Sequence, residues 1–259
     1  MELFDSHAHY NDEKFDEDRS FIIEEIYKSG VTRFVSAGYS LESSKAGIEI
    51  SKNYDYVYTT CGVSPNDIPS SKIKIDEELI QIKALAEQNK KVLAIGEIGL
   101  DYYWNTDNKE LQMYAFKEQI KIANALNLPI MIHTRDAIMD TIDIIKNNDF
   151  AKPGIFHCCP FNKDLISAGL KKGFYISFAG PVTFKNSKNA EEIVKMVPLD
   201  KILIETDSPY LAPEPNRGKR NDSRNVFYIA KKIAEFKGMT LDEIAATTYK
   251  NANKVFGLE

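Results

Sequence analysis

Short apolar runs alternate with longer amphipathic segments from one end of the chain to the other. Eight of the runs have the length and the β-branched or aromatic content that are typical of strands. A helical pattern follows each run, and no low-complexity linker interrupts the alternation. The predicted strands cover residues 3–6, 31–37, 56–62, 92–97, 129–133, 154–157, 174–178 and 202–205.

The segments between these runs carry apolar residues three or four positions apart, the pattern of helices that bury one face. The pattern that begins at residues 21–26 stops at Gly30, a residue type that commonly follows a helix C-terminus. After the last strand pattern, Thr240 stands three residues before Glu243, which is the spacing of a capping box. We therefore expect an extra C-terminal helix that runs towards Phe256.

Several strand patterns are nearly continuous apolar strings, such as residues 92–95 and 202–204. Such strings are typical of parallel strands that are covered on both faces. Eight successive β/α units predict a TIM barrel, an α/β fold that forms a single domain over residues 1–259. An open doubly wound sheet is the alternative, but it gathers its ligands at one switch point. Polar residues follow strands one, four, five, six and eight, which only a closed barrel brings together.

The chain carries 33 Lys and Arg residues against 38 Asp and Glu residues, a net charge of −5, and 43% of its residues are hydrophobic. This balance predicts no general basic surface for nucleic acid. Local groups or bound cations would therefore have to hold a phosphate-bearing substrate. The charge does not exclude DNA.

Three cysteines, Cys61, Cys158 and Cys159, form no C-x-x-C motif, so we expect small buried side chains, with a soft metal ligand as the alternative. No basic segment or long apolar segment precedes the first strand pattern at Leu3. No apolar run approaches the roughly 20 residues that cross a bilayer. These features predict a reduced, cytoplasmic protein without a membrane partner.

All four histidines lie at the ends of predicted strands: His7 and His9 after the first, His133 after the fifth and His157 after the sixth. The two-residue spacing of His7 and His9 puts both imidazoles on one face of an extended chain, about 6.5 Å apart along the backbone. A lone strand-end histidine is often only a hydrogen-bonded core residue. Four at one end of a barrel predict a site for divalent metal ions.

Two carboxylates belong to the same pattern. Glu97 ends the fourth predicted strand, where an ion pair with a lysine is the alternative to metal binding, and its two oxygens could bridge two ions. Asp207 follows the eighth strand, directly before a Ser-Pro step that turns the chain away. A carboxylate there can be both a ligand and a proton acceptor. For Glu205 we expect a structural role, paired with a lysine or arginine inside the barrel.

The motifs around these residues resemble the TatD family of metal-dependent deoxyribonucleases, within the amidohydrolase-like TIM barrels. The resemblance spans the chain and keeps the order of the family's motifs. It rests on residues 4–9 (FDSHAH), 96–102 (GEIGLDY), 132–137 (IHTRDA), 157–158 (HC), 205–210 (ETDSPY), 218–221 (GKRN) and 251–256 (NANKVF).

The resemblance implies a metal centre with two divalent cations, of which Zn, Mg and Mn are all compatible with imidazole and carboxylate ligands. It implies that His7 and His9 hold one ion with Asp207, that His133 and His157 hold the other, and that Glu97 bridges them. It also implies hydrolysis of phosphodiester bonds in DNA, commonly from a 3′ end. In this mechanism Glu97 and Asp207 are the catalytic residues, and Asp207 accepts or orients the proton of the attacking water.

Two loops depart from the family pattern. The family usually shows Gly-x-His-Pro-His after the third strand, where this chain has Ser64 and Asn66 in place of the histidines. The loop after the sixth strand is also altered, at residues 159–162. We expect Ser64 and Asn66 to face the substrate and to give a slower or differently selective phosphodiesterase.

Candidate phosphate-binding residues are Arg135, just after the fifth strand, and Lys219 with Arg220 in the loop after the eighth. The alternative for each is a solvated loop charge. Tyr102, Tyr103 and Trp104 could stack on a base or pack as an aromatic lid. An amidohydrolase acting on a small cyclic amide or ester is the alternative enzyme, and a metal-binding protein without turnover is the alternative of another class. The basic residues favour phosphate over amide.

Overall fold

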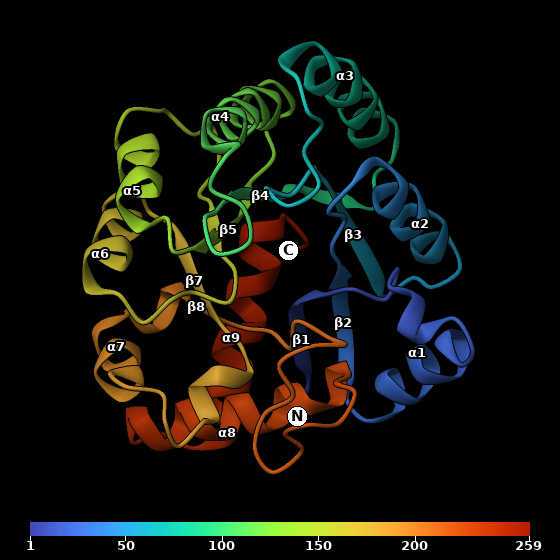
Figure 1. Ribbon diagram of the computed structural model, residues 1–259. Helices are drawn as coiled ribbons and strands as arrows, with labels where there is room; N and C mark the ends of the chain where they lie inside the picture. Colours follow the sequence, from blue (N-terminus) through green and yellow to red (C-terminus); the bar gives the residue numbers. More distant parts are fainter.

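The computed structural model describes residues 1–259, and its eight parallel strands follow one another around the sheet in chain order. Figure 1 shows the strands as an inner ring with the helices outside it. The strands are β1 (Leu3–Ala8), β2 (Val31–Ser36), β3 (Val57–Cys61), β4 (Val92–Asp101), β5 (Ile130–Arg135), β6 (Ile155–Phe156), β7 (Tyr175–Phe178) and β8 (Ile202–Ile204). The predicted TIM barrel is confirmed.

A helix follows each strand, and a ninth helix ends the chain as the capping box predicted. The helices are α1 (Arg19–Lys28), α2 (Leu41–Lys52), α3 (Lys72–Gln88), α4 (Lys109–Leu126), α5 (Ile138–Lys146), α6 (Lys163–Lys171), α7 (Ala190–Met196), α8 (Val226–Lys237) and α9 (Leu241–Phe256). Four short 3-10 helices lie in the connecting segments, at Glu13–Phe15, Gly180–Thr183, Leu199–Lys201 and Ser223–Asn225. None of the helices combines the length and the apolar character that a bilayer-spanning helix needs.

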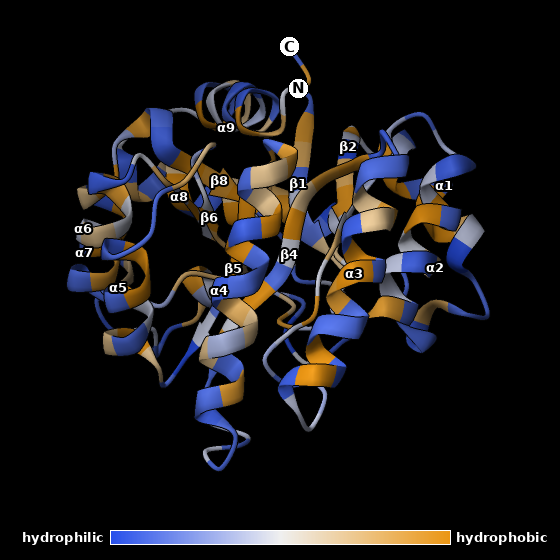
Figure 2. Ribbon diagram, turned by 90° about the horizontal axis from the view of Figure 1, so that it is seen from above, coloured by the Kyte–Doolittle hydropathy of each residue, from blue (hydrophilic) through white to orange (hydrophobic).

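The extra helix α9 lies across the N-terminal ends of the strands, behind the ring in Figure 1. Its Ala252, Val255 and Phe256 join a buried cluster to which every strand contributes. Because side chains from all eight strands meet there, the cluster lies inside the barrel. The strand members are Phe4, Val35, Leu93, Ala94, Met131, Ile155, Tyr175 and Leu203, and the partly buried Tyr58 of β3 packs against them. Figure 2 shows this apolar interior beneath the helices, with both chain ends on the α9 side.

The seam between β1 and β8 closes through the loop that follows β8. Backbone N–H groups of Asp207 and His9 donate to the carbonyls of His7 (2.9 Å) and Ser208 (2.6 Å). The Ser6 hydroxyl donates to the Ile204 carbonyl at 3.0 Å. Two candidate ligand segments are therefore joined backbone to backbone at the mouth of the barrel.

Three strands extend beyond their predicted ends. β1 continues to Ala8, past His7, β4 continues to Asp101, past Glu97, and β5 continues to Arg135, past His133. The pairing of β4 with β5 shifts its register between Ile95 and Ile98 and then resumes. The expectations that His7 follows its strand and that Glu97 and His133 end theirs are therefore wrong. His133 is paired with Gly99 of β4, whereas Glu97 lies in the register shift, where its backbone N–H donates to the carbonyl of Gly38.

Candidate metal centre

The C-terminal ends of the strands surround a pocket of about 690 Å³. Candidate ligands from five different segments line it: His9, Glu97, His133, His157 and Asp207. His7 lies beneath them and is fully buried. The barrel thus brings together all six residues that the sequence predicted as metal ligands. This is the end of the barrel at which TIM-barrel enzymes place their chemistry.

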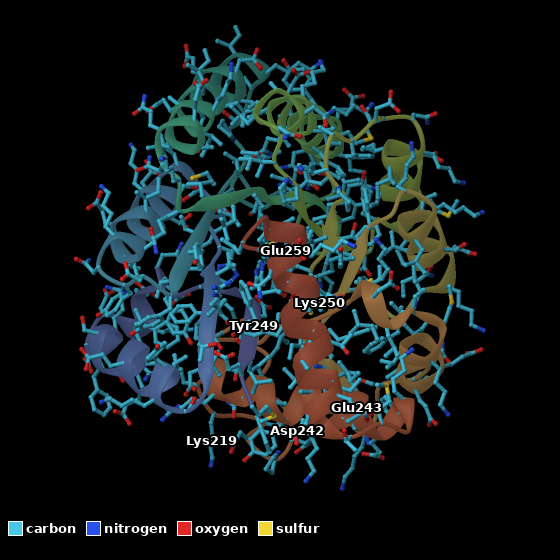
Figure 3. All side chains as sticks on the ribbon, turned by 180° about the vertical axis from the view of Figure 1, so that it is seen from behind. Lys219, Asp242, Glu243, Tyr249, Lys250 and Glu259 are labelled. Carbon is cyan, nitrogen blue, oxygen red and sulfur yellow. The ribbon has the colours of Figure 1, made fainter.

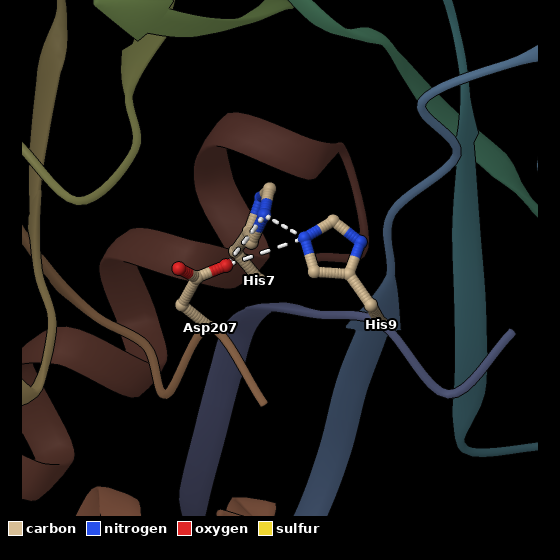
Figure 4. A group of neighbouring side chains, drawn as sticks. All are labelled: His7, His9 and Asp207. Carbon is tan, nitrogen blue, oxygen red and sulfur yellow. Dashed lines mark hydrogen bonds and ion pairs between the residues drawn. The ribbon is translucent and has the colours of Figure 1, made fainter. Parts of the chain in front are cut away.

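One group of ligand atoms consists of His7, His9 and Asp207 (Figure 4). The Nε2 atoms of His7 and His9 are 3.0 Å apart. Asp207 Oδ1 lies 3.4 Å from His7 Nε2 and 3.2 Å from His9 Nε2. These three atoms face one small volume between β1 and the loop after β8.

A second group forms around Oε1 of Glu97. That oxygen is 2.9 Å from His133 Nδ1 and 3.5 Å from His157 Nε2. The other carboxylate oxygen, Oε2, faces the first group, 3.4 Å from His7 Nε2 and 3.6 Å from His9 Nε2. The single carboxylate of Glu97 therefore presents one oxygen to each pair of imidazoles.

In three histidines, the ring nitrogen that faces away from the pocket forms a hydrogen bond with an oxygen atom of the protein. His9 Nδ1 faces the Ala37 carbonyl (3.2 Å), His157 Nδ1 faces Glu205 Oε1 (3.2 Å), and His133 Nε2 faces Asp101 Oδ2 (2.9 Å). Oxygen acceptors at these positions fix which nitrogen carries the proton. Each neutral ring then turns a lone pair into the pocket, the arrangement found at metal-binding histidines.

His7 differs, because its Nδ1 faces the sulfur of Met131 at 2.8 Å, a weak acceptor. Its Nε2 still faces the pocket.

The converging lone pairs show that this set of donors fits divalent cations. His133 Nδ1 and His157 Nε2 are 3.2 Å apart, yet neither has a proton to donate when both rings are neutral. No lysine or arginine pairs with Glu97 or Asp207, so the predicted alternative of a Glu97–lysine pair is absent. Buried carboxylates and inward lone pairs require a positive charge between them. Either protons or metal ions supply it.

The carboxylates and imidazoles shift one another's pKa values strongly. Burial alone would raise the pKa of Glu97, but the charge of His157 and hydrogen bonds from His133, His157 and His7 hold it well below its usual range. Burial and His157 lower the pKa of His7, but Asp207 and Glu97 outweigh them and raise it to about 9. The pKa of Asp207 is lowered in spite of burial by hydrogen bonds from His7 and His9. The pocket therefore favours bound positive charge.

Two further carboxylates orient the ligands. Asp101 accepts from His133 Nε2 and Asn66 Nδ2 through Oδ2, and from the backbone N–H of Tyr103 and Trp104 through Oδ1. Sequence reasoning quoted Asp101 within a motif but gave it no role. Asp101 lies four residues after the predicted end of the fourth strand, so the sequence pattern did not place it beside the ligands; the actual strand continues to Asp101.

Glu205 is fully buried, as expected, but its partner differs from the prediction. No lysine or arginine reaches it; instead Oε1 accepts from His157 Nδ1 (3.2 Å) and from the Cys158 N–H (2.7 Å). Oε2 has no hydrogen-bond partner. Glu205 directly follows β8 and its side chain lies beneath His157, so a histidine and a backbone N–H take the place of the expected lysine or arginine.

Asp5, another residue missed at the sequence level, supports the first group of ligands from below. It is fully buried, and its carboxylate accepts from the backbone N–H of Thr206 (2.9 Å) and His7 (3.3 Å) and from the hydroxyls of Thr206 and Ser223. Burial raises the pKa of Asp5 to about 7 against these hydrogen bonds. The network joins β1 to the segments on both sides of Asp207.

The substrate-facing predictions divide into two sets. Arg135 and Trp104 line the pocket, together with Ser64 and Asn66. The Ser64 hydroxyl donates to Asp67 Oδ2 at 2.5 Å, and the Asn66 amide donates to Asp101 Oδ2 at 3.2 Å. The third-strand loop therefore presents neutral side chains that are already engaged with carboxylates.

Lys219 and Arg220 are not brought to the pocket. They line a separate groove with Met1 and Leu3, at the outer edge of the barrel where Figure 3 labels Lys219. Arg220 forms a bidentate ion pair with Asp18, at 2.9 and 2.5 Å. The loop after β8 runs outward beyond Tyr210, so it carries both residues away from the metal centre. Their predicted contact with phosphate finds no support in this geometry.

An eight-stranded α/β barrel with imidazoles and carboxylates converging at its mouth defines the class of metal-dependent TIM-barrel hydrolases. Within this class, the family model of the TatD-related DNases matches residues 4–257. The chain belongs to that family. The resemblance found in the motifs is thereby confirmed.

Relatives agree with this assignment over nearly the full chain. An uncharacterized metal-dependent hydrolase of Bacillus subtilis, YabD, is 43% identical over 255 residues, which are 98% of each protein. The 3′-5′ ssDNA/RNA exonuclease TatD of Escherichia fergusonii is 31% identical over 262 residues, 99% of each. Among solved structures, the TatD homologue YJJV of Escherichia coli superposes with a TM-score of 0.90 at 24% identity, covering 99% of this chain and 98% of that one.

Proposed function

We propose that this protein is a two-metal phosphodiesterase that cleaves single-stranded DNA from its 3′ end. One observation carries the proposal: Oε1 of Glu97 faces His133 and His157, while Oε2 faces His7 and His9. A carboxylate that serves two groups of imidazoles suits a bridge between two cations about 3.5–4 Å apart. The exonuclease activity named for the relative from Escherichia fergusonii supports the choice of substrate.

The residues of the chain divide the work as follows. His7, His9 and Asp207 would hold one cation, His133 and His157 the other, and Glu97 both. Bound divalent cations supply the charge that lowers the pKa of water and stabilises the leaving oxygen. Asp207, with only Oδ1 turned to the imidazoles, accepts or orients the proton of the attacking water.

Arg135 favours a phosphate over an uncharged amide as substrate. It lines the pocket, projects from the same strand as His133 and has no acidic partner. A guanidinium there can donate two hydrogen bonds to the oxygens of one phosphate. A small cyclic amide would leave this charge without a partner.

The test is a comparison of substrates with the metal-stripped protein after addition of Zn²⁺, Mn²⁺ or Mg²⁺. A 5′-labelled single-stranded oligonucleotide should give a ladder of products shortened from the 3′ end, and a small cyclic amide should remain intact. Asp207→Asn, purified in parallel, controls for contaminating nucleases, and the exposed Asp200→Asn is the matched variant away from the site. Rapid hydrolysis of the amide without cleavage of DNA would contradict the proposal.

A further inference from the structure

Arg135 differs from the other five arginines of the chain. Each of those five contacts an acidic, amide or carbonyl acceptor: Arg19, Arg33, Arg217, Arg220 and Arg224. Arg135 has neither an ion pair nor a side-chain hydrogen bond, and its guanidinium lies 3.7 Å from the ring centre of Tyr103 and 5.5 Å from that of Trp104. Aromatic rings hold this charge in place without neutralising it.

Trp104 extends this arrangement along the pocket wall. Its side chain lines the pocket although the residue is 68% exposed. Its backbone N–H and that of Tyr103 are turned to Asp101, which also bonds the metal-ligand candidate His133. The backbone that carries this exposed indole is thus linked through Asp101 to a candidate metal ligand.

A second cation lies on an aromatic ring at Tyr210. The ammonium of Lys14 is 4.2 Å from the ring centre and has no ion pair. The Tyr210 hydroxyl donates to Asp12 at 2.6 Å, which fixes the ring at the pocket wall, where the residue is 43% exposed.

The two arrangements lie on opposite sides of the mouth. Trp104 follows β4 and Arg135 ends β5, whereas Lys14 follows β1 and Tyr210 follows β8. In a barrel whose strands run in chain order from β1 to β8, the β4–β5 side is opposite the β8–β1 side. The candidate metal ligands lie between them.

We propose that Trp104 with Arg135, and Tyr210 with Lys14, form two nucleotide subsites that hold a single strand on either side of the bond to be cleaved. A base stacks on each ring, and each cation neutralises a phosphate next to the reacting one. Stacking needs an exposed base face, which paired bases in a duplex do not offer. The inference rests on the proposed phosphodiesterase function and adds the residues that select the polymer.

The proposed subsites should affect KM and kcat differently, because the stacking rings do not contact the reacting phosphate. Stacking holds the strand but does not touch the reacting phosphorus, so its loss acts mainly on KM. Loss of one base–aromatic contact should raise KM for a short oligothymidylate about ten- to hundredfold. Hydrolysis of bis(p-nitrophenyl) phosphate, which has no base, should change much less.

Four variants test the subsites, each with metal content and thermal unfolding measured first. Trp104→Ala and Tyr210→Leu should each raise KM for the oligonucleotide, with kcat affected less. Trp104→Phe should restore most of the loss, because it keeps an aromatic face. Phe21→Ala removes an aromatic side chain that is 63% exposed on α1, outside the pocket, and should behave as wild type.

The outcomes separate this inference from the proposed function. Suppose that the wild type cleaves both substrates and that Trp104→Ala and Tyr210→Leu leave the KM for the oligonucleotide unchanged. The subsite proposal is then wrong, while the proposed phosphodiesterase function is supported. A proportional loss on both substrates would also overturn the subsites, because it would point to a damaged metal centre. If the metal-loaded wild type cleaves neither substrate, both the proposed function and the proposed subsites are contradicted.

Discussion

His133 Nδ1 lies 3.2 Å from His157 Nε2, although each ring bonds an oxygen acceptor through its other nitrogen. Two neutral imidazoles cannot satisfy each other in this orientation, since both turn a lone pair to the gap. Together with Oε1 of Glu97 they form a site that is complete only when it holds positive charge. The acceptors behind the rings, Asp101 and Glu205, therefore set the affinity for that charge.

Asp101→Asn should weaken metal binding about 10–100-fold, the usual cost of losing a group that orients a ligand. Both Asp101 oxygens accept hydrogen bonds, Oδ2 from His133 and Asn66 and Oδ1 from backbone N–H groups. An amide must turn its NH₂ against one of these sets of donors. Titration with Zn²⁺ followed by calorimetry measures the change.

Glu205→Gln is the matched comparison. Only Oε1 of Glu205 is engaged, so the amide can keep its oxygen there and place its NH₂ at the unpartnered Oε2 position. The loss of metal affinity should therefore be smaller than in Asp101→Asn. The reverse order would show that charge, and not the direction of hydrogen bonds, controls these histidines.

Asp207→Asn should keep the fold and lose at least about two decades in rate, because an amide cannot take a proton. Single-turnover cleavage at saturating metal is the measurement, with metal content determined on the same sample. Near-normal turnover with full metal content would reassign the base, most directly to Glu97.

How much of this centre the sequence predicts differs from residue to residue. The six candidate ligands follow from their place at the ends of apolar runs, and the barrel follows from the alternation of those runs. The role of Asp101 could not be predicted, because it depends on a strand that extends past its apolar run. The buried, structural place of Glu205 was predicted, but its partner was not, because the partner depends on which histidine lies above an inward side chain. In the sequence, Lys219, Arg220 and Arg135 are all basic residues at or after the end of a predicted strand. Only the course of the loop after β8 shows that Lys219 and Arg220 lie away from the pocket.

Gly99→Ala should lower the free energy of unfolding by roughly 2–6 kcal/mol, since backbone strain and overpacking add. Gly99 has a φ of +142°, and an added Cβ would run into the carbonyl oxygen of His133 on the paired strand. Gly173→Ala is the control, because it also has a positive φ (+79°) but nothing within 4 Å of an added Cβ. It should cost about 1–3 kcal/mol. Urea unfolding of both variants gives the difference, and equal losses would rule out the clash.

Ser64→His should raise the rate of oligonucleotide cleavage about tenfold at fixed metal occupancy, because a charged imidazole donates a stronger hydrogen bond to phosphate than a hydroxyl does. The single change is preferred to a double change with Asn66, whose amide bonds Asp101 and so supports His133. The exposed Ser70→His is the control. A rate that stays level or falls would mean that this loop serves a different substrate.

The bridging position of Glu97 is tested most directly by anomalous X-ray diffraction from crystals soaked in Mn²⁺ or Zn²⁺. The account predicts two anomalous peaks roughly 3.5–4 Å apart, one among His7, His9 and Asp207 and one between His133 and His157, with an oxygen of Glu97 on each. Glu97→Ala should lose at least one peak. A single peak in the wild type at saturating metal, or two peaks that Glu97 does not join, would contradict the account.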